Sequence, residues 1–138
     1  MGVYLGVDLG EKRIGLAVSD ELKILANPLV TLIFESRKKL VEDLRKVIAE
    51  YQVEQIIVGL PKTLDNKMGP AAQKVSALVG WLKTQIETPW MFWDERLTSA
   101  EVEKVLITAD VSRARRKEVR DQLAAQRILQ NFLDFNRR

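Results

Sequence analysis

The N-terminal segment contains two apolar stretches, VYLGVD at residues 3–8 and IGLAVS at residues 14–19, joined through a short turn, GEKR. Both stretches are predicted to be strands, and the turn indicates that they pair. The first strand is apolar on both of its faces, which is typical of a strand in the middle of a sheet that is covered on both sides. Asp8 lies near the end of this strand, among Gly6, Gly10 and Gly15. An ionised carboxylate in an apolar setting is costly unless a positive charge meets it, so we expect a positive group or ion beside Asp8.

Strand and helix patterns alternate along the rest of the chain. Further strands are predicted at residues 29–33, 54–61 and 90–93, and helices are predicted from the cap residue Ser36 to Tyr51, from near Pro70 to Ile86, from near Thr98, and over about residues 117–135. The basic stretch at residues 109–120 is expected to be a loop that leads into the last helix. The element order βββαβαβα favours an α/β fold in which helices flank a mixed sheet.

The length of 138 residues is that of one domain, and we expect a single domain over residues 1–138. No apolar run approaches the roughly 20 residues of a membrane-spanning helix. The N-terminus lacks the layout of a signal peptide because Asp8 interrupts its apolar run. The expected protein is therefore soluble and cytoplasmic, without a membrane partner.

The chain contains no cysteine and no histidine. The first absence excludes disulfides, thiolate zinc sites and cysteine nucleophiles. The second excludes the commonest general base, the Ser-His-Asp triad and imidazole metal ligands. Any catalysis must then use carboxylates, lysines, hydroxyls or a metal held by oxygen, and oxygen ligands favour Mg²⁺ or Mn²⁺.

Charge is distributed unevenly along the chain. Residues 1–95 contain 12 basic and 13 acidic side chains, whereas residues 96–138 contain 10 basic and 6 acidic ones. A basic C-terminal third suits a polyanionic partner such as a nucleic acid, although a solvated basic surface would give the same count.

Acidic residues occur near the ends of several predicted elements. Asp8 lies late in the first strand, and Asp94 and Glu95 end the fifth. Asp121 continues the apolar stripe of the last helix, since residues 121, 124, 125, 128 and 132 follow helical spacing. Acids gathered at strand ends would repel each other unless a cation intervenes, so the pattern predicts a site for Mg²⁺ or Mn²⁺.

Each acid also has a simpler structural interpretation. Asp8 can accept hydrogen bonds from the turn that follows it, and Asp94 or Glu95 can pair with Arg96 or cap a helix at Thr98. Asp121 can complement the dipole at a helix start. Taken together, in a chain with a basic tail and no histidine, the acids favour a metal site.

Four motifs together resemble one family. The stretches GVDLGEKRIGLAVSD, IIVGLPKTLDN, FWDERLTSAE and VRDQLAAQRIL, in this order, are similar to those of the YqgF family. This family is the RuvC-like branch of the RNase H superfamily, and its bacterial members are named as pre-16S rRNA nucleases. The resemblance runs the length of the chain.

The resemblance implies an RNase H-like fold, with a five-stranded mixed sheet and helices on both faces. It also implies an acidic triad, in which Asp8 and Asp121 match two motifs. The third acid comes from the DER motif, with Glu95 the first choice and Asp94 the second. The implied activity is metal-dependent hydrolysis of phosphodiester bonds, with two ions held by the triad.

The implied partner is a nucleic acid. Structured RNA, and pre-16S rRNA in particular, is the favoured substrate, and branched DNA such as a four-way junction is the alternative. Contacts to the phosphate backbone are expected from the basic residues Lys12, Arg13, Arg96, Arg113, Arg115, Arg116, Lys117 and Arg120, whose exposed side chains would look the same without a ligand. We expect a monomer or a weak homodimer.

Two other functions compete with the nuclease. The stretch D-x-G before a β-hairpin also resembles the phosphate loop of the actin-like and sugar-kinase ATPases, but those proteins close two such domains around a nucleotide. A non-catalytic RNA-binding module would keep the fold and the basic surface, with the acids only structural. The apparent triad favours the nuclease over both.

Overall fold

The computed structural model describes residues 2–61, 68–94 and 113–136. A five-stranded sheet with the strand order β3-β2-β1-β4-β5 forms its centre. The strands are β1 (Val3–Leu9), β2 (Arg13–Ser19), β3 (Ala26–Ile33), β4 (Val53–Leu60) and β5 (Trp90–Asp94), and the helices are α1 (Arg37–Tyr51), α2 (Pro70–Gln85) and α4 (Arg113–Asn136). The predicted α/β fold, with the order βββαβαβα, is confirmed.

The sheet is mixed, as predicted. β1 and β2 pair antiparallel, as do β2 and β3, whereas β4 runs parallel to both β1 and β5. The carboxyl ends of β1, β4 and β5 therefore meet at one edge of the sheet, which we call the carboxyl edge. Two of the predicted acids lie at this edge, where Asp8 pairs with Gly15 and Asp94 pairs with Leu60.

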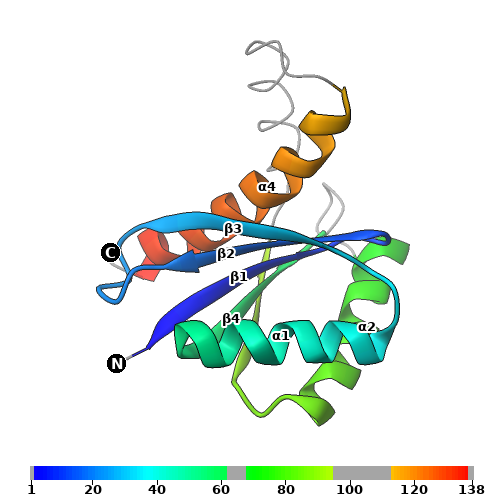
Figure 1. The fold of residues 1–138 in the computed structure, drawn as a ribbon, viewed down its shortest axis with the longest axis horizontal. Helices are drawn as coiled ribbons and strands as arrows, with labels where there is room; N and C mark the ends of the chain where they lie inside the picture. Colours follow the sequence, from blue (N-terminus) through cyan, green and yellow to red (C-terminus); the bar gives the residue numbers. More distant parts are fainter. Residues whose placement is uncertain (1, 62–67, 95–112, 137–138) are drawn as a thin grey trace.

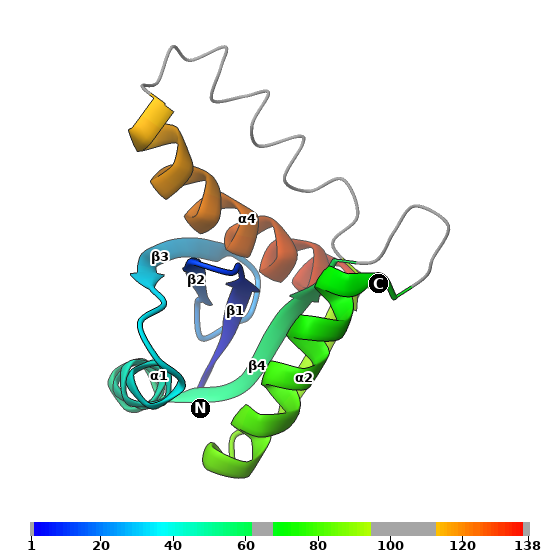
Figure 2. The same ribbon diagram turned by 90° about the vertical axis from the view of Figure 1, so that its right-hand side faces the viewer.

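Helices cover both faces of the sheet. α1 and α2 lie against one face, and α4 crosses the other (Figures 1 and 2). We call these the α1/α2 face and the α4 face. The larger core fills the α1/α2 face and includes Leu5, Val7, Leu16, Leu44, Ile56, Val58 and Leu82. The smaller core fills the α4 face and includes Ala17, Ile57, Ala125, Ile128, Leu129 and Phe132.

Local signals account for the first two helices. The Ser36 hydroxyl accepts a hydrogen bond from the backbone N–H of Lys39 at 3.1 Å, which caps α1 as predicted. Pro70 begins α2, where its missing N–H costs nothing. Each helix buries an apolar stripe against the sheet, which consists of Leu40, Val41 and Leu44 in α1 and of Ala72, Val75, Val79 and Leu82 in α2.

β3 begins earlier than the sequence predicts. The strand starts at Ala26 rather than at residue 29, and it contains Pro28. β3 is an edge strand, and its register with β2 shifts between Leu16 and Ala17, opposite Pro28. Proline is tolerated at such a place because an edge strand with a local irregularity does not need every N–H.

The last helix begins earlier than predicted, because α4 starts at Arg113 rather than near residue 117, so the prediction of a loop is wrong for residues 113–116. Arg113, Arg115, Arg116 and Lys117 are thus part of the helix backbone. The stretch RARRKEVR contains no glycine or proline, and arginine, lysine, glutamate and alanine all favour helix. The N-terminal part of α4 extends past the sheet (Figure 2). The helix predicted near Thr98 lies outside the described residues.

Two glutamines of α4 bind the start of β3. Gln130 accepts a hydrogen bond from the backbone N–H of Ala26 at 2.8 Å and donates one to the carbonyl of Ile24 at 2.9 Å. Gln126, one turn earlier, donates to the carbonyl of Ala26 at 2.9 Å. These side chains satisfy backbone groups at the sheet edge and tie α4 to it.

Within the described residues, no helix is both long and apolar enough to cross a membrane.

Replacing Gln130 tests this attachment. Gln130→Leu leaves the N–H of the buried Ala26 without its acceptor, and we expect the free energy of unfolding to fall by about 1–3 kcal/mol. Urea denaturation followed by circular dichroism measures the change. The control is Asn131→Leu at the neighbouring exposed position, where a change within about 0.5 kcal/mol is expected. Equal effects of the two substitutions would contradict this role of Gln130.

Candidate active site at the carboxyl edge

Asp8 lies in the middle strand and points to the α4 face. Its neighbours Val7 and Leu9 belong to the core of the α1/α2 face, and side chains alternate along a strand. Asp8 is half-buried and lies beside Gly15 of β2. Directly paired residues of two strands have their side chains on the same face, so the absent side chain of Gly15 leaves the space beside Asp8 open.

That space is filled by the backbone of α4. A Cβ atom on Gly15 would overlap the carbonyl oxygen of Asp121, so only glycine lets the helix lie this close. A Cβ atom on Gly6 would come within 2.9 Å of the carbonyl oxygen of Ala125, one turn further along α4. With these two glycines, the structure brings the backbone of Asp121 next to the residue that pairs with Asp8.

The environment of Asp121 is unusual for a carboxylate. Its Oδ2 atom is buried and has no hydrogen-bond partner among the described residues. Burial raises the pKa of Asp121 above its ordinary value, while the positive charges of Arg120 and Arg13 act in the opposite direction. A buried oxygen without a partner is expensive, so the fold alone gives no reason to keep it there.

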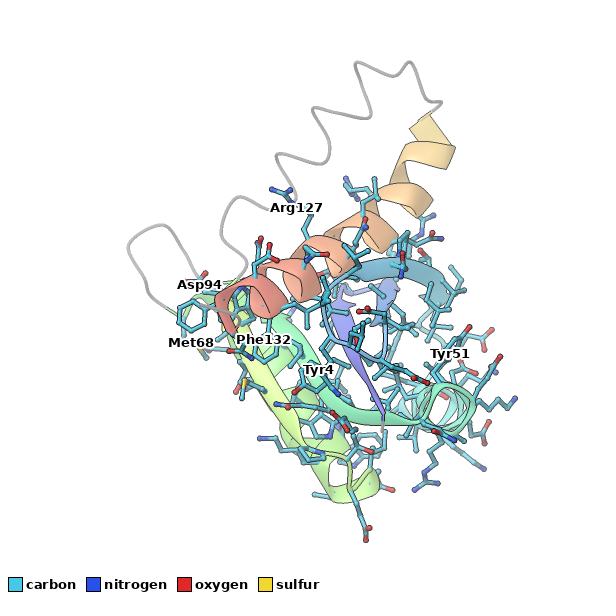
Figure 3. All side chains as sticks on the ribbon, turned by 90° about the vertical axis from the view of Figure 1, so that its left-hand side faces the viewer. Tyr4, Tyr51, Met68, Asp94, Arg127 and Phe132 are labelled. Atoms are coloured by element: carbon cyan, nitrogen blue, oxygen red, sulfur yellow. The ribbon has the colours of Figure 1, made fainter. Side chains whose placement is uncertain are left out.

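Asp94 lies on the other side of the sheet. It pairs with Leu60, and Phe92, two residues before it, packs in the core of the α1/α2 face. Trp93 points the opposite way and packs edge-on against Phe132 of α4, with ring centroids 5.7 Å apart. Figure 3 shows Asp94 at the end of β5 and Phe132 under α4. Asp94 is therefore separated from Asp8 and Asp121 by the sheet. Glu95 and Arg96 lie outside the described residues.

The predicted basic residues occupy two regions. Lys12 is exposed in the turn between β1 and β2, and Arg13 is half-buried at the start of β2. Arg120 is half-buried on α4, next to Asp121. The other four belong to the first turns of α4, where the structure describes the backbone only.

The donor set fits a hard divalent cation. Asp8 and Asp121 offer carboxylate oxygens on one face of the sheet, and the buried Oδ2 of Asp121 has a free coordination position. Within the described ranges, no group of three acidic, histidine or cysteine side chains is close enough to hold an ion. For an ion at this place, these two acids would supply only part of the ligand set, and a further ligand would have to come from elsewhere.

Gly15 is the positioning residue that the sequence analysis did not identify as such. The signal was present, because a glycine inside a predicted strand often marks close approach of another backbone. What the sequence lacks is the identity of the approaching segment, since Asp121 is more than 100 residues away from Gly15 along the chain. The tertiary contact alone shows that Gly15 sets the place of Asp121.

Gly15→Ala is expected to displace α4. The new methyl group overlaps a backbone atom that cannot rotate away, so we expect a loss of about 2–4 kcal/mol in the free energy of unfolding. Gly80→Ala is the matched control, because Gly80 is in α2 with nothing within 4 Å of the added Cβ. That variant should gain about 0.5–1 kcal/mol. Chemical denaturation of both variants gives the comparison, and a neutral effect of Gly15→Ala would refute the contact.

Asp121→Asn is expected to stabilise the metal-free protein at neutral pH. Burial raises the pKa of Asp121 on folding. The ionisation of this one carboxyl therefore lowers the free energy of unfolding of the wild-type protein as pH rises above the ordinary pKa of 3.8. The amide cannot ionise, and the advantage of the variant should disappear toward pH 3. Denaturation in a chelator across this pH range tests the sign, with the exposed Glu42→Gln as the control for removing one negative charge. Lower stability of Asp121→Asn at pH 7 would contradict it.

The chain is similar over nearly its whole length to proteins that are named as nucleases. A protein from Thermoanaerobacter pseudethanolicus named "Putative pre-16S rRNA nuclease" is 50% identical over 131 residues, which cover 94% of each chain. A protein of the same name from Listeria innocua is 46% identical over 132 residues, covering 94% of this chain and 96% of its own.

Solved structures show the same fold at low identity. Thermus thermophilus RuvC in complex with a Holliday junction substrate matches with a TM-score of 0.55 at 18% identity, over 99% of this chain and 96% of its own. The Fowlpox virus resolvase in complex with Holliday junction DNA matches with a TM-score of 0.58 at 11% identity, over 99% of both chains. The expected RNase H-like fold of the RuvC type is thus confirmed. A family model described as "RuvX: Holliday junction resolvase" matches residues 2–135, and the chain belongs to this family.

Proposed function

We propose that this chain is a nuclease that hydrolyses phosphodiester bonds with the help of divalent metal ions, and that its substrate is the 5′ region of pre-16S rRNA in the cytoplasm. The observation that carries the proposal is the buried, unpartnered Oδ2 of Asp121 beside the strand position of Asp8. Relatives that share up to half of its residues over nearly the whole chain support the substrate.

Asp8, Asp121 and Glu95 are the proposed ligands for Mg²⁺ or Mn²⁺. The first two lie on the α4 face of the sheet. Asp94 points to the opposite face, which disfavours it as the third acid and leaves Glu95 of the DER motif as the proposed one. The set consists of carboxylates, which are the ligands that these ions prefer.

The chain's own residues then have distinct tasks in hydrolysis. Burial makes the negative charge of Asp121 costly, so a cation that meets this carboxylate is favoured. β1 and α4 hold Asp8 and Asp121 on rigid elements, which fixes the direction of their oxygens. When bound, a pair of such ions supplies a nucleophile at neutral pH and stabilises the leaving oxygen. No histidine base is then required.

Basic residues on both sides of the acids are proposed to hold the nucleic acid backbone. Lys12 and Arg13 lie in or after the β1–β2 turn, and Arg120 precedes Asp121. The part of α4 that extends past the sheet contains Arg113, Arg115, Arg116 and Lys117 (Figure 2). Arg96 directly follows Glu95 in the sequence. Phosphate contacts of this kind give affinity without sequence preference, and they weaken as salt rises.

Cleavage of four-way DNA junctions is the second candidate. It is favoured by the family description and by the fold shared with resolvases that are solved on such junctions. A junction resolvase must cut two strands and so must present two active sites. A chain that stays monomeric would disfavour this activity, and we propose a monomer or weak homodimer that acts on RNA.

Cleavage assays with matched substrates test the proposal. Wild-type protein with Mg²⁺ or Mn²⁺ should cut a 5′-extended 16S precursor RNA, and Asp8→Asn should lower the rate at least about 100-fold because a metal ligand is lost. Asp20→Asn is unsuitable as a control, since that side chain holds the β2–β3 turn, and Glu42→Gln on α1 serves instead.

The outcomes separate the candidate functions. Metal-dependent cutting of the RNA that Asp8→Asn abolishes supports the proposal. Cutting only a synthetic four-way junction would keep the chemistry and change the substrate. RNA binding without cleavage, at any metal concentration, would favour a non-catalytic module and would contradict the nuclease.

A further inference from the structure

Arg13 has a fixed place on the α4 face. It is the first residue of β2, and its neighbours Ile14 and Leu16 point into the core of the other face. Its carbonyl accepts a hydrogen bond from the N–H of Gly10 at 2.9 Å, and on its other side it pairs with Ile33 of β3. The guanidinium therefore extends from a rigid backbone, on the same face as Asp8 and Asp121.

The spacing along β2 brings Arg13 close to the acids. Arg13 and Gly15 point the same way and are about 7 Å apart along the strand, and Gly15 contacts the backbone of Asp121. Gly10, next to Arg13 in the turn, has no side chain to stand between Arg13 and Asp8. Arg13 is half-buried, as is Asp8.

Arg120 is also half-buried, yet its position differs. It precedes Asp121 on α4, so its backbone belongs to the helix and not to the sheet. The side chain of Arg13 extends from β2, at a position between the β1–β2 turn and Gly15. Of these two arginines, Arg13 is the one whose strand also pairs directly with the strand of Asp8.

We propose that Arg13 is a phosphate-positioning residue of this site, which binds the phosphodiester next to the cleaved bond once cations occupy the acids. This inference rests on the proposed nuclease function. A planar guanidinium can hold two phosphate oxygens at once, which fixes the orientation of the phosphate as well as its charge.

Removing the charge of Arg13 should change the affinity for metal and the affinity for substrate in opposite directions. Removal of a positive charge near the acids reduces repulsion of a divalent cation, so metal binding becomes tighter. The same removal takes a ligand away from the phosphate, so substrate binding becomes weaker. A residue that only supports the fold of the β1–β2 turn would change neither affinity in this combination.

Calorimetric titration of Mn²⁺ into the metal-free full-length protein is the first measurement. Arg13→Gln should bind Mn²⁺ about three- to tenfold more tightly than wild type, in low salt where charges act at this range. Lys46→Gln removes the same charge from an exposed position on α1, at the other face of the sheet, and should leave the affinity unchanged. Steady-state cleavage at saturating Mn²⁺ should then show a KM at least fivefold higher for Arg13→Gln, with kcat less affected.

Arg13→Lys keeps the test sharp if the glutamine variant does not fold. Lysine keeps the charge, so Mn²⁺ affinity should stay within about twofold of wild type, while KM rises because the two-oxygen contact is lost. An unchanged KM in Arg13→Lys, or Mn²⁺ affinity that is unchanged or weaker in a folded Arg13→Gln, would overturn this inference and leave the nuclease standing. Wild-type protein that binds no Mn²⁺ would overturn both.

Discussion

The close contact between α4 and the β1–β2 pair determines most of what this molecule can do. Gly6 and Gly15 remove side chains from one face of the sheet at two points, and carbonyl oxygens of α4 occupy the space. The helix can thus bury Ile128, Leu129 and Phe132 against the strands and at the same time bring Asp121 beside Asp8. A larger residue at either glycine would separate the core and the acids together, so packing and site geometry have one cause.

The same contact creates a cost. A carboxylate on the buried side of α4 loses hydration, and the unpartnered Oδ2 of Asp121 has a raised pKa as a result. Apolar residues continue the stripe on later turns, where Ala124 and Ala125 are almost fully buried. An alanine at position 121 would fit this stripe without any such cost. Retention of an acid at a place that favours an apolar residue is what functional sites show when they trade stability for chemistry.

Sequence patterns predicted the parts of the fold that depend on local rules. Ser36 predicted the start of α1 because its hydroxyl caps the helix, and helical spacing from Asp121 to Phe132 predicted the face of α4 that meets the sheet. The start of β3 was missed because Pro28 argues against a strand unless the edge position is known. The choice between Asp94 and Glu95 was open for a similar reason. The face of Asp94 follows only from its pairing with Leu60, and Glu95 lies outside the described residues.

In the proposed nuclease, α4 would also connect the bound substrate to Asp121 through one continuous helix. Its basic first turns and Asp121 belong to one continuous helix, and Arg113 and Asp121 are separated by about 12 Å of helix rise. A nucleic acid held by the projecting turns would therefore pull on the element that places a proposed metal ligand, and Gln126 and Gln130 tie the far part of that element to β3. Because Gln126 and Gln130 hold the C-terminal part of the helix, phosphate contacts near Arg113 should affect catalysis through the orientation of α4 as well as affinity through charge.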